Sequence, residues 1–149
     1  METLKYLQNM TSNNALHNQS AIEDMISKEI LTDENLIGID ANDVKNLKSN
    51  SDFIDGIVID GKLDELGALT SEAVNQIKEL HSDNLFIGLM LKIRVAERCE
   101  LMMEQLGSLH DVLDNLGEEV FAIWGIEMNA PVTDEIRICL LCGFKKNSL

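Results

Sequence analysis

LIGIDANDVKNLKSN, residues 36–50, decides the fold, because it separates a helical pattern from an apolar strand pattern. The stretch places Asp40 and Asp43 three residues apart. On one helical turn the two carboxylates would share a face and could hold a water or a cation between them. A simpler alternative makes Asp40 the N-cap of a helix and Asp43 an acid in its first turn, where the helix dipole favours negative charge. Residue chemistry alone favours the capping interpretation.

Three further segments have the spacing of amphipathic helices. Apolar residues recur every three or four positions in residues 20–31, 71–80 and 97–116. Ser20 and Glu23 have the spacing of a capping box, which predicts that the first of these helices begins at Ser20. Residues 1–9 are expected to form a short helix that a polar connection joins to it.

Four apolar segments alternate with these helices and predict strands, in residues 53–62, 85–93, 120–128 and 134–144. The turn residues 129–133 include Pro131, so we expect the last two strands to pair as a hairpin. The pattern predicts an α/β (α+β) fold, a two-layer arrangement of a mixed sheet with helices packed on one face. Leu109 is expected to lie between the longest helix and that sheet.

The composition restricts the possible partners. The chain has 149 residues and a formal net charge of −14, which disfavours nucleic acid and anionic membrane surfaces because both would repel it. No apolar run is long enough to cross a bilayer, and the N-terminus lacks the pattern of a signal peptide. We therefore expect a cytoplasmic protein with no nucleic-acid or membrane partner.

No motif for catalysis, metal or cofactor binding is convincing. The nine glycines are scattered, and neither a dinucleotide-binding nor a phosphate-binding loop is present. Cys139 and Cys142 form a CxxC spacing, but three residues apart on a strand they would point to opposite faces. His17, His81 and His110 lie too far apart in sequence to indicate a metal cluster. We expect no cofactor and no metal.

The segment LIGIDANDVK, residues 36–45, resembles the synergy loop of FtsZ, the bacterial relative of tubulin, whose usual pattern is Leu-Ile-Asn-Val-Asp-Phe-Ala-Asp-Val-Lys. The four strand segments FIDGIVIDGK, LFIGLMLKI, VFAIWGIEM and DEIRICLLCGF resemble, in the same order, the strands that follow this loop in FtsZ. The resemblance runs from about residue 21 to residue 144. It implies the C-terminal, polymerisation-side domain of an FtsZ-like protein without its GTP-binding domain, as residues 36–149, after an N-terminal helical segment, residues 1–35.

The resemblance also implies a role for the acidic pair. In FtsZ-like filaments the synergy loop enters the nucleotide pocket of the neighbouring subunit, where its acids help to position a cation and water for attack on the γ-phosphate. Asp40 and Asp43 match these acids, whereas Gly38 and Ala41 depart from the family pattern, which puts catalytic competence in doubt. The chain is not expected to be an enzyme by itself, and its implied partner-binding residues are Gly38, Asp40, Asn42, Asp43 and Lys45.

Three functional hypotheses follow. The first is an interaction module that docks on an FtsZ- or tubulin-like subunit through the synergy-loop face and caps or modulates filament polymerisation in cell division. The second is a structural protein that associates with itself as a homodimer and has no tubulin-like partner. The third is a small ligand-binding α/β domain that uses the acidic pair.

Overall fold

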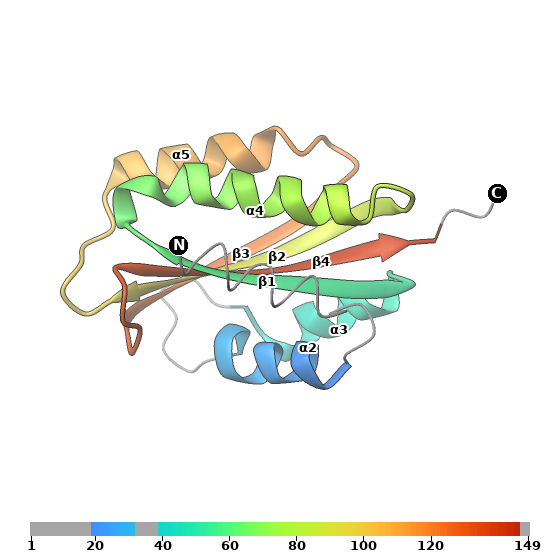
Figure 1. Cartoon of the computed structure of the whole chain (residues 1–149), viewed down its shortest axis with the longest axis horizontal. Helices are drawn as coiled ribbons and strands as arrows, with labels where there is room; N and C mark the ends of the chain where they lie inside the picture. The colour runs from blue at the N-terminus through green and yellow to red at the C-terminus, as the bar shows by residue number, and fades with distance from the viewer. Residues whose placement is uncertain (1–18, 32–38, 147–149) are drawn as a thin grey trace.

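The structure is a computed structural model that describes residues 19–31 and 39–146. In these residues a four-stranded sheet lies between two layers of helices (Figure 1). The elements follow in the order α2 (Gln19–Met25), η2 (Ile26–Ile30), α3 (Ala41–Ser49), β1 (Phe53–Gly61), η3 (Leu63–Glu65), α4 (Leu66–Leu80), β2 (Leu85–Ala96), α5 (Met103–Asp114), β3 (Phe121–Ala130) and β4 (Ile136–Lys145).

The expected α/β class is confirmed, and each expected strand is present, but the strand order differs from the predicted hairpin. The order in the sheet is β1-β4-β2-β3. β4 pairs antiparallel with both β1 and β2, while β3 pairs parallel with β2. The prediction that the last two strands pair across the turn is therefore wrong. The turn at 131–135 instead carries the chain past the end of β2, where the amide of Ala96 donates to the carbonyl of Glu135 over 2.9 Å.

The burial of the strands explains this order. Every residue of β4 from Ile138 to Phe144 is buried, as expected for a central strand with helices on both faces. β3 begins and nearly ends with exposed residues, and only Gly125–Glu127 and Ala130 are buried, which suits the edge of a sheet. Among the described residues, β3 has a strand neighbour on one side only.

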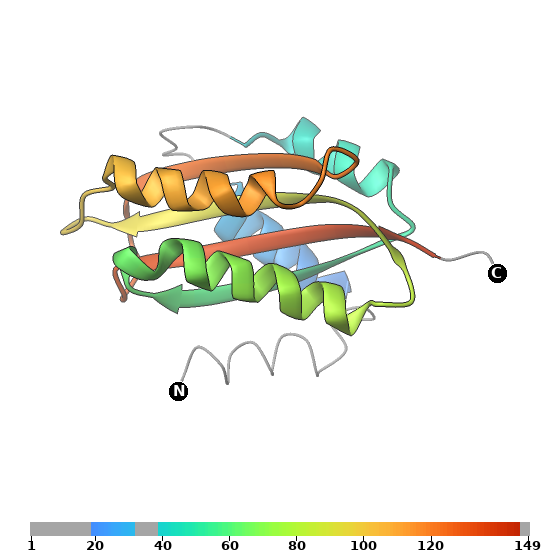
Figure 2. The same ribbon diagram turned by 90° about the horizontal axis from the view of Figure 1, so that it is seen from above.

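Helices cover both faces of the sheet, which corrects the expected two-layer arrangement with helices on one face. α4 and α5 lie side by side on one face (Figure 2), and α2, η2 and α3 lie on the other (Figure 1). Each face has its own apolar cluster. The α4/α5 face buries Ile57, Ile77, Leu91, Leu109 and Phe144, and the α2/α3 face buries Ile22, Ile26, Leu47, Met90 and Leu141.

Several helix boundaries differ from the predicted ones. The first helix includes Gln19, so Ser20 lies inside it and is not its N-cap, and its last turn is a π-helix. α4 starts earlier than expected and α5 is shorter, ending at Asp114 before the turn residue Gly117, whose φ is 97°. Leu109 is buried as predicted. The expected helix in residues 1–9 lies outside the described residues. None of the described helices has the length and apolar character to cross a membrane.

Candidate functional site

The start of α3 carries the acidic pair, and the structure shows how both carboxylates are held. Asp40 is the N-cap: its Oδ1 accepts a hydrogen bond from the Asp43 amide over 3.1 Å. In return, Oδ2 of Asp43 accepts from the Asp40 amide over 3.0 Å. This reciprocal pair is a capping box, which satisfies two amides that the helix itself leaves without partners. The capping interpretation is therefore confirmed.

The same turn also presents a polar surface. Asp40, Asn42 and Lys45 are exposed, and Asp43 is half-buried. Val44 and Leu47, on the opposite side of α3, are buried against the sheet. The apolar side thus fixes the helix, and the capping box fixes the direction of both carboxylates. Gly38, the remaining predicted partner-binding residue, lies outside the described residues.

The acidic pair can accept hydrogen bonds but is not part of a complete metal site. Each carboxylate uses one oxygen in the capping box and has a second oxygen for other contacts. No group of three or more metal-ligating side chains occurs within the part of the chain that the structure describes. A cation bound by Asp40 and Asp43 would need further ligands, for example from a partner molecule.

A row of four charged side chains crosses the sheet on the α2/α3 face. Strand register aligns Asp60 of β1 with Arg137 of β4, Arg137 with Arg94 of β2, and Arg94 with Glu127 of β3. Arg137 binds Asp60 through Nε at 2.7 Å and Nη2 at 3.1 Å. Arg94 binds Glu127 through Nε at 3.0 Å and Nη2 at 3.4 Å. Two carboxylates therefore flank two neighbouring arginines.

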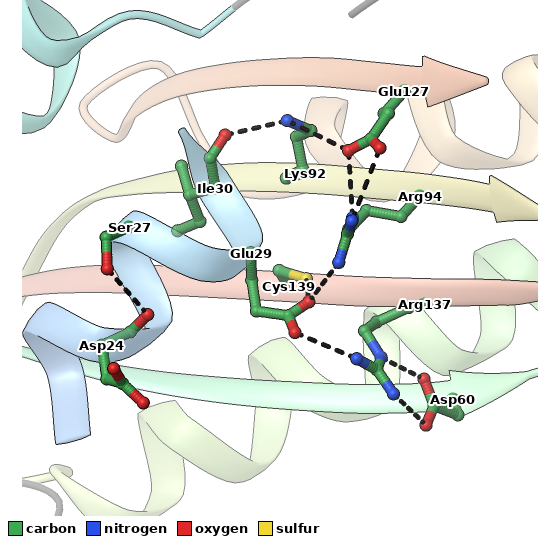
Figure 3. Close-up of polar contacts among 10 residues, drawn as sticks. All are labelled: Asp24, Ser27, Glu29, Ile30, Asp60, Lys92, Arg94, Glu127, Arg137 and Cys139. Atoms are coloured by element: carbon green, nitrogen blue, oxygen red, sulfur yellow. Dashed lines mark hydrogen bonds and ion pairs between the residues drawn. The ribbon is translucent and has the colours of Figure 1, made fainter. Parts of the chain in front are cut away.

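η2 contributes a third carboxylate, which lies between the two arginines (Figure 3). Glu29 accepts from Nη1 of Arg94 over 2.8 Å and from Nη1 of Arg137 over 2.9 Å. Beside it, the fully buried Lys92 donates to the carbonyl of Ile30 over 2.8 Å, and its Nζ lies 3.7 Å from Glu127. The network joins all four strands to the end of η2.

Burial changes the ionisation of two groups in or beside this network. It lowers the pKa of Lys92, an effect that the nearby Glu127 carboxylate opposes. It also raises the pKa of the Cys139 thiol well above its usual value, and the neighbouring Glu29 acts in the same direction. Cys139 is therefore a neutral thiol at physiological pH and adds no charge to the network.

A second buried polar pair lies on the α4/α5 face. Nε2 of His81, which follows α4, lies 2.7 Å from Oδ2 of Asp55 on β1, and both side chains are at least 95% buried. The amide of Gly56 donates to the other oxygen of Asp55 over 2.8 Å. Phe53 and Phe144 flank the imidazole, with ring centroids 5.1 and 4.8 Å from it. Burial raises the pKa of Asp55, although its hydrogen bond to His81 opposes the shift.

Sequence reasoning identified the capping pair but missed both buried polar groups. Glu29, Arg94 and Arg137 are far apart in sequence, and only strand register and helix packing bring them together. The signal that could have found them is the charged residues inside apolar strand patterns, in FIDGIVIDGK and LFIGLMLKIRVA. A charge at such a position requires a buried partner.

The remaining sequence candidates are structural. Cys139 and Cys142 are both buried and belong to the apolar clusters on opposite faces, as their spacing on a strand predicts. His110 is exposed on α5. Trp124 is half-buried and packs against the α4/α5 cluster. His17 lies outside the described residues.

An open cleft of about 540 Å³ lies beside the ends of β1 and β2 and the start of α5. Its lining includes Lys62, Arg98, Cys99, Gln105 and Glu135. The acidic pair of α3 does not line this cleft. A small ligand bound there would therefore not contact Asp40 or Asp43.

The fold matches that of part of FtsZ. An empty FtsZ dimer from M. jannaschii superimposes with a TM-score of 0.56 and 15% sequence identity, over 87% of this chain and 42% of that one. A tryptophan-to-tyrosine variant of M. jannaschii FtsZ gives a TM-score of 0.58 and 20% identity, over 89% of this chain and 39% of the FtsZ chain. Neither a family model nor a curated protein sequence matches the chain.

These comparisons define the class of fold: a mixed α/β fold like that of part of FtsZ. The chain spans about two fifths of the FtsZ chains that it matches. Thiamine monophosphate kinase from Aquifex aeolicus is more distant, with a TM-score of 0.47 and 10% identity, over 84% of this chain and 42% of that one. The resemblance noted in the sequence and the FtsZ-like fold therefore agree.

Proposed function

We propose that this chain is an interaction module that docks on an FtsZ- or tubulin-like subunit through the start of α3, and that docking caps or modulates filament assembly in cell division. The observation that carries this proposal is the position of Asp40 and Asp43. They form an exposed, hydrogen-bonded turn in a chain whose fold matches part of FtsZ.

The geometry of the turn supports docking. A binding surface that is already ordered loses less conformational entropy when a partner binds. The capping box orients both carboxylates before any partner arrives, and Asn42 and Lys45 extend the exposed polar surface. Gly38 precedes this surface in the sequence and completes the proposed contact.

The proposed role does not include catalysis by the chain alone. Asp40 and Asp43 would at most complete the GTPase site of a partner, by orienting water or a cation near its nucleotide. A molecule docked through this surface would occupy the contact face of a filament subunit and would keep the next subunit from that face. That is the physical basis of the proposed capping.

Light scattering of a purified FtsZ that polymerises with GTP tests the proposal. We expect the wild-type chain, at concentrations near that of FtsZ, to change the scattering plateau. The variant Asp40→Asn/Asp43→Asn should lose most of this effect, because it keeps the shape of the turn and removes its charge. The matched control is Asp111→Asn/Asp114→Asn on α5, which changes the net charge equally and should act as wild type.

Two outcomes would contradict the proposal. If both double variants act as wild type, the start of α3 is not the contact. If the wild-type chain leaves polymerisation unchanged at every concentration, the partner is not FtsZ-like. Capture of partners from native cell extract, read by mass spectrometry with wild type and Asp40→Asn/Asp43→Asn in parallel, then shows whether any partner depends on the acidic pair.

A further inference from the structure

Two neighbouring arginines on the α2/α3 face lie opposite each other on adjacent strands. Arg94 and Arg137 are direct cross-strand partners on β2 and β4. Like charges in such positions repel each other. Each arginine turns its Nε and Nη2 outward, to Glu127 and Asp60 respectively. Each Nη1 is left to bind a group located between them.

Glu29 is that group, and its contacts are those of a bound carboxylate ligand. Its two oxygens are divided between the two arginines, Oε2 to Arg94 at 2.8 Å and Oε1 to Arg137 at 2.9 Å. The Cys139 thiol lies 3.7 Å from Oε2 and donates a third, weaker hydrogen bond from the sheet. The side chains of Glu29, Arg94 and Arg137 are 18%, 7% and 24% exposed, so water screens the Arg94 contact less than the Arg137 contact.

We propose that Arg94 and Arg137 form a carboxylate-binding site on the sheet, and that Glu29 is its intramolecular ligand. The site recognises a carboxylate because two fixed guanidinium groups donate to two oxygens. Removal of the Glu29 carboxylate takes one negative charge from between two guanidinium groups and leaves both Nη1 groups without this acceptor. A small carboxylate such as formate should then occupy the vacated space.

Occupancy of this site fixes the end of η2. Glu29 is adjacent to Ile30, whose carbonyl accepts from the buried Lys92 over 2.8 Å. Two consecutive residues are thus bound to the sheet, one through its side chain and one through its backbone. Between Ile30 and the acidic pair at the start of α3 lie nine residues. On the basis of the proposed function, the carboxylate site fixes the last described helical residues that precede the partner-binding surface in the chain; the site itself does not depend on that function.

Chemical rescue of the full-length variant Glu29→Ala tests the carboxylate site. Loss of one partner of a mostly buried ion pair should lower the melting temperature by about 5–15 °C. Formate at several hundred millimolar should restore a substantial part of this loss, whereas sodium chloride of equal ionic strength should not. The matched control is Glu23→Ala, which removes an exposed glutamate paired with Lys48 on the same side of the sheet. We expect this control to melt near wild type and to show no specific response to formate.

A second variant separates site occupancy from a general effect of formate. In Glu29→Ala/Arg137→Met the guanidinium pair is broken, so formate should act no more strongly than chloride. If formate stabilises this double variant as much as Glu29→Ala, the arginines do not form the site. The proposal is also overturned if Glu29→Ala and Glu23→Ala have the same melting temperature. It is overturned as well if formate and chloride raise the melting temperature of Glu29→Ala equally.

Hydrogen exchange extends the test to a variant that keeps the size of the side chain. Glu29→Gln retains one acceptor oxygen but carries no charge. We expect the amides of residues 19–30 to exchange about tenfold faster than in wild type, while those of α4 change little. Unchanged exchange in residues 19–30 would contradict the proposal. None of these measurements involves a filament partner, so they fail or succeed independently of the proposed function.

Discussion

Both faces of the sheet pack their helices through apolar clusters, and the α2/α3 face adds a charge network to this packing. On one face, α4 and α5 pack through an apolar cluster that contains Leu109, with the Asp55–His81 pair buried near its end. On the other face, η2 is joined to all four strands by a charge network around Glu29. Apolar burial is non-directional, whereas the charged contacts accept one geometry only. The first face therefore supplies cohesion, and the second also sets the position of a helix.

Removal of Arg94 should have the largest effect on stability. Arg94→Met leaves Glu127 and Glu29 with fewer cationic partners in a buried place. Breaking one side of such a pair costs about 3–5 kcal/mol, and urea unfolding measures the loss. The control is Arg94→Met/Glu127→Met, which removes the opposite charge as well and should recover part of the stability. If the free energy of unfolding of Arg94→Met falls by less than about 1 kcal/mol, the charge network does not stabilise the α2/α3 face, and the two faces do not differ in this respect.

Truncation of Leu109 should have the next largest effect, because it tests the apolar face. Leu109→Ala removes a fully enclosed side chain of α5 and leaves a cavity, so the free energy of unfolding should fall by about 2–5 kcal/mol. Leu80→Ala serves as the control, because Leu80 is 50% exposed and its loss should cost less than about 1 kcal/mol. Equal losses of unfolding free energy in both variants would show that Leu109 is not buried between α5 and the sheet.

The Asp55–His81 pair gives a smaller effect that depends on pH. Asp55→Asn replaces a buried carboxyl group by a neutral amide and should change stability by about 1–3 kcal/mol near pH 7. Because burial raises the pKa of Asp55, the folded protein binds this proton more tightly than the unfolded chain does. The contribution of Asp55 is therefore fully present below its ordinary pKa of 3.8 and declines as the pH rises through its raised value.

Thermal unfolding from pH 4 upward checks this sign. The stability of wild type relative to Asp55→Asn should fall as the pH rises, since the variant cannot ionise at this position. A difference that grows with pH would show that the ionised carboxylate is the favoured form in the folded protein. Such a result would mean that the hydrogen bond to His81 outweighs burial.

The capping pair should have the smallest effect on stability. Asp40→Asn/Asp43→Asn retains side-chain oxygens that can accept the same backbone hydrogen bonds, so the free energy of unfolding should fall by about 1 kcal/mol or less. Urea unfolding measures this change, and Asp40→Ala/Asp43→Ala is the control that removes both acceptors. If the free energy of unfolding of the asparagine variant falls by more than about 2 kcal/mol, Asp40 and Asp43 mainly stabilise the fold. Such a result would weaken their proposed role in docking.

The sequence predicts the elements of this fold better than their order. Periodicity identified the four strands, and residue type identified the cap of α3, because these depend on neighbouring residues only. The position of β4 depends on long-range pairing, and a short connection usually joins adjacent strands. The continuous apolar run ICLLCGF in β4 is typical of a strand buried on both faces and could have indicated a central position.

The candidate sites divide in the same way. Asp40 and Asp43 could be predicted because a capping box is local in sequence. Glu29 and Arg137 are 108 residues apart. Residue types alone do not specify which of the 26 acidic side chains pairs with which basic side chain. Strand register supplies that information, since it aligns Asp60, Arg137, Arg94 and Glu127 in one row.

In the part of the chain that the structure describes, the outer edge of β3 has no strand neighbour, and this has a consequence for the colloidal behaviour of the protein. Phe121–Ala130 contains neither lysine nor proline, its one charged residue, Glu127, is engaged in the buried network, and Phe121 is 47% exposed. Such edges attract further strands unless something keeps molecules apart. The net charge of −14 supplies that repulsion over the whole surface. Solubility should therefore depend on electrostatics, and acidification toward the isoelectric point of about 4.4 removes the protection of this edge.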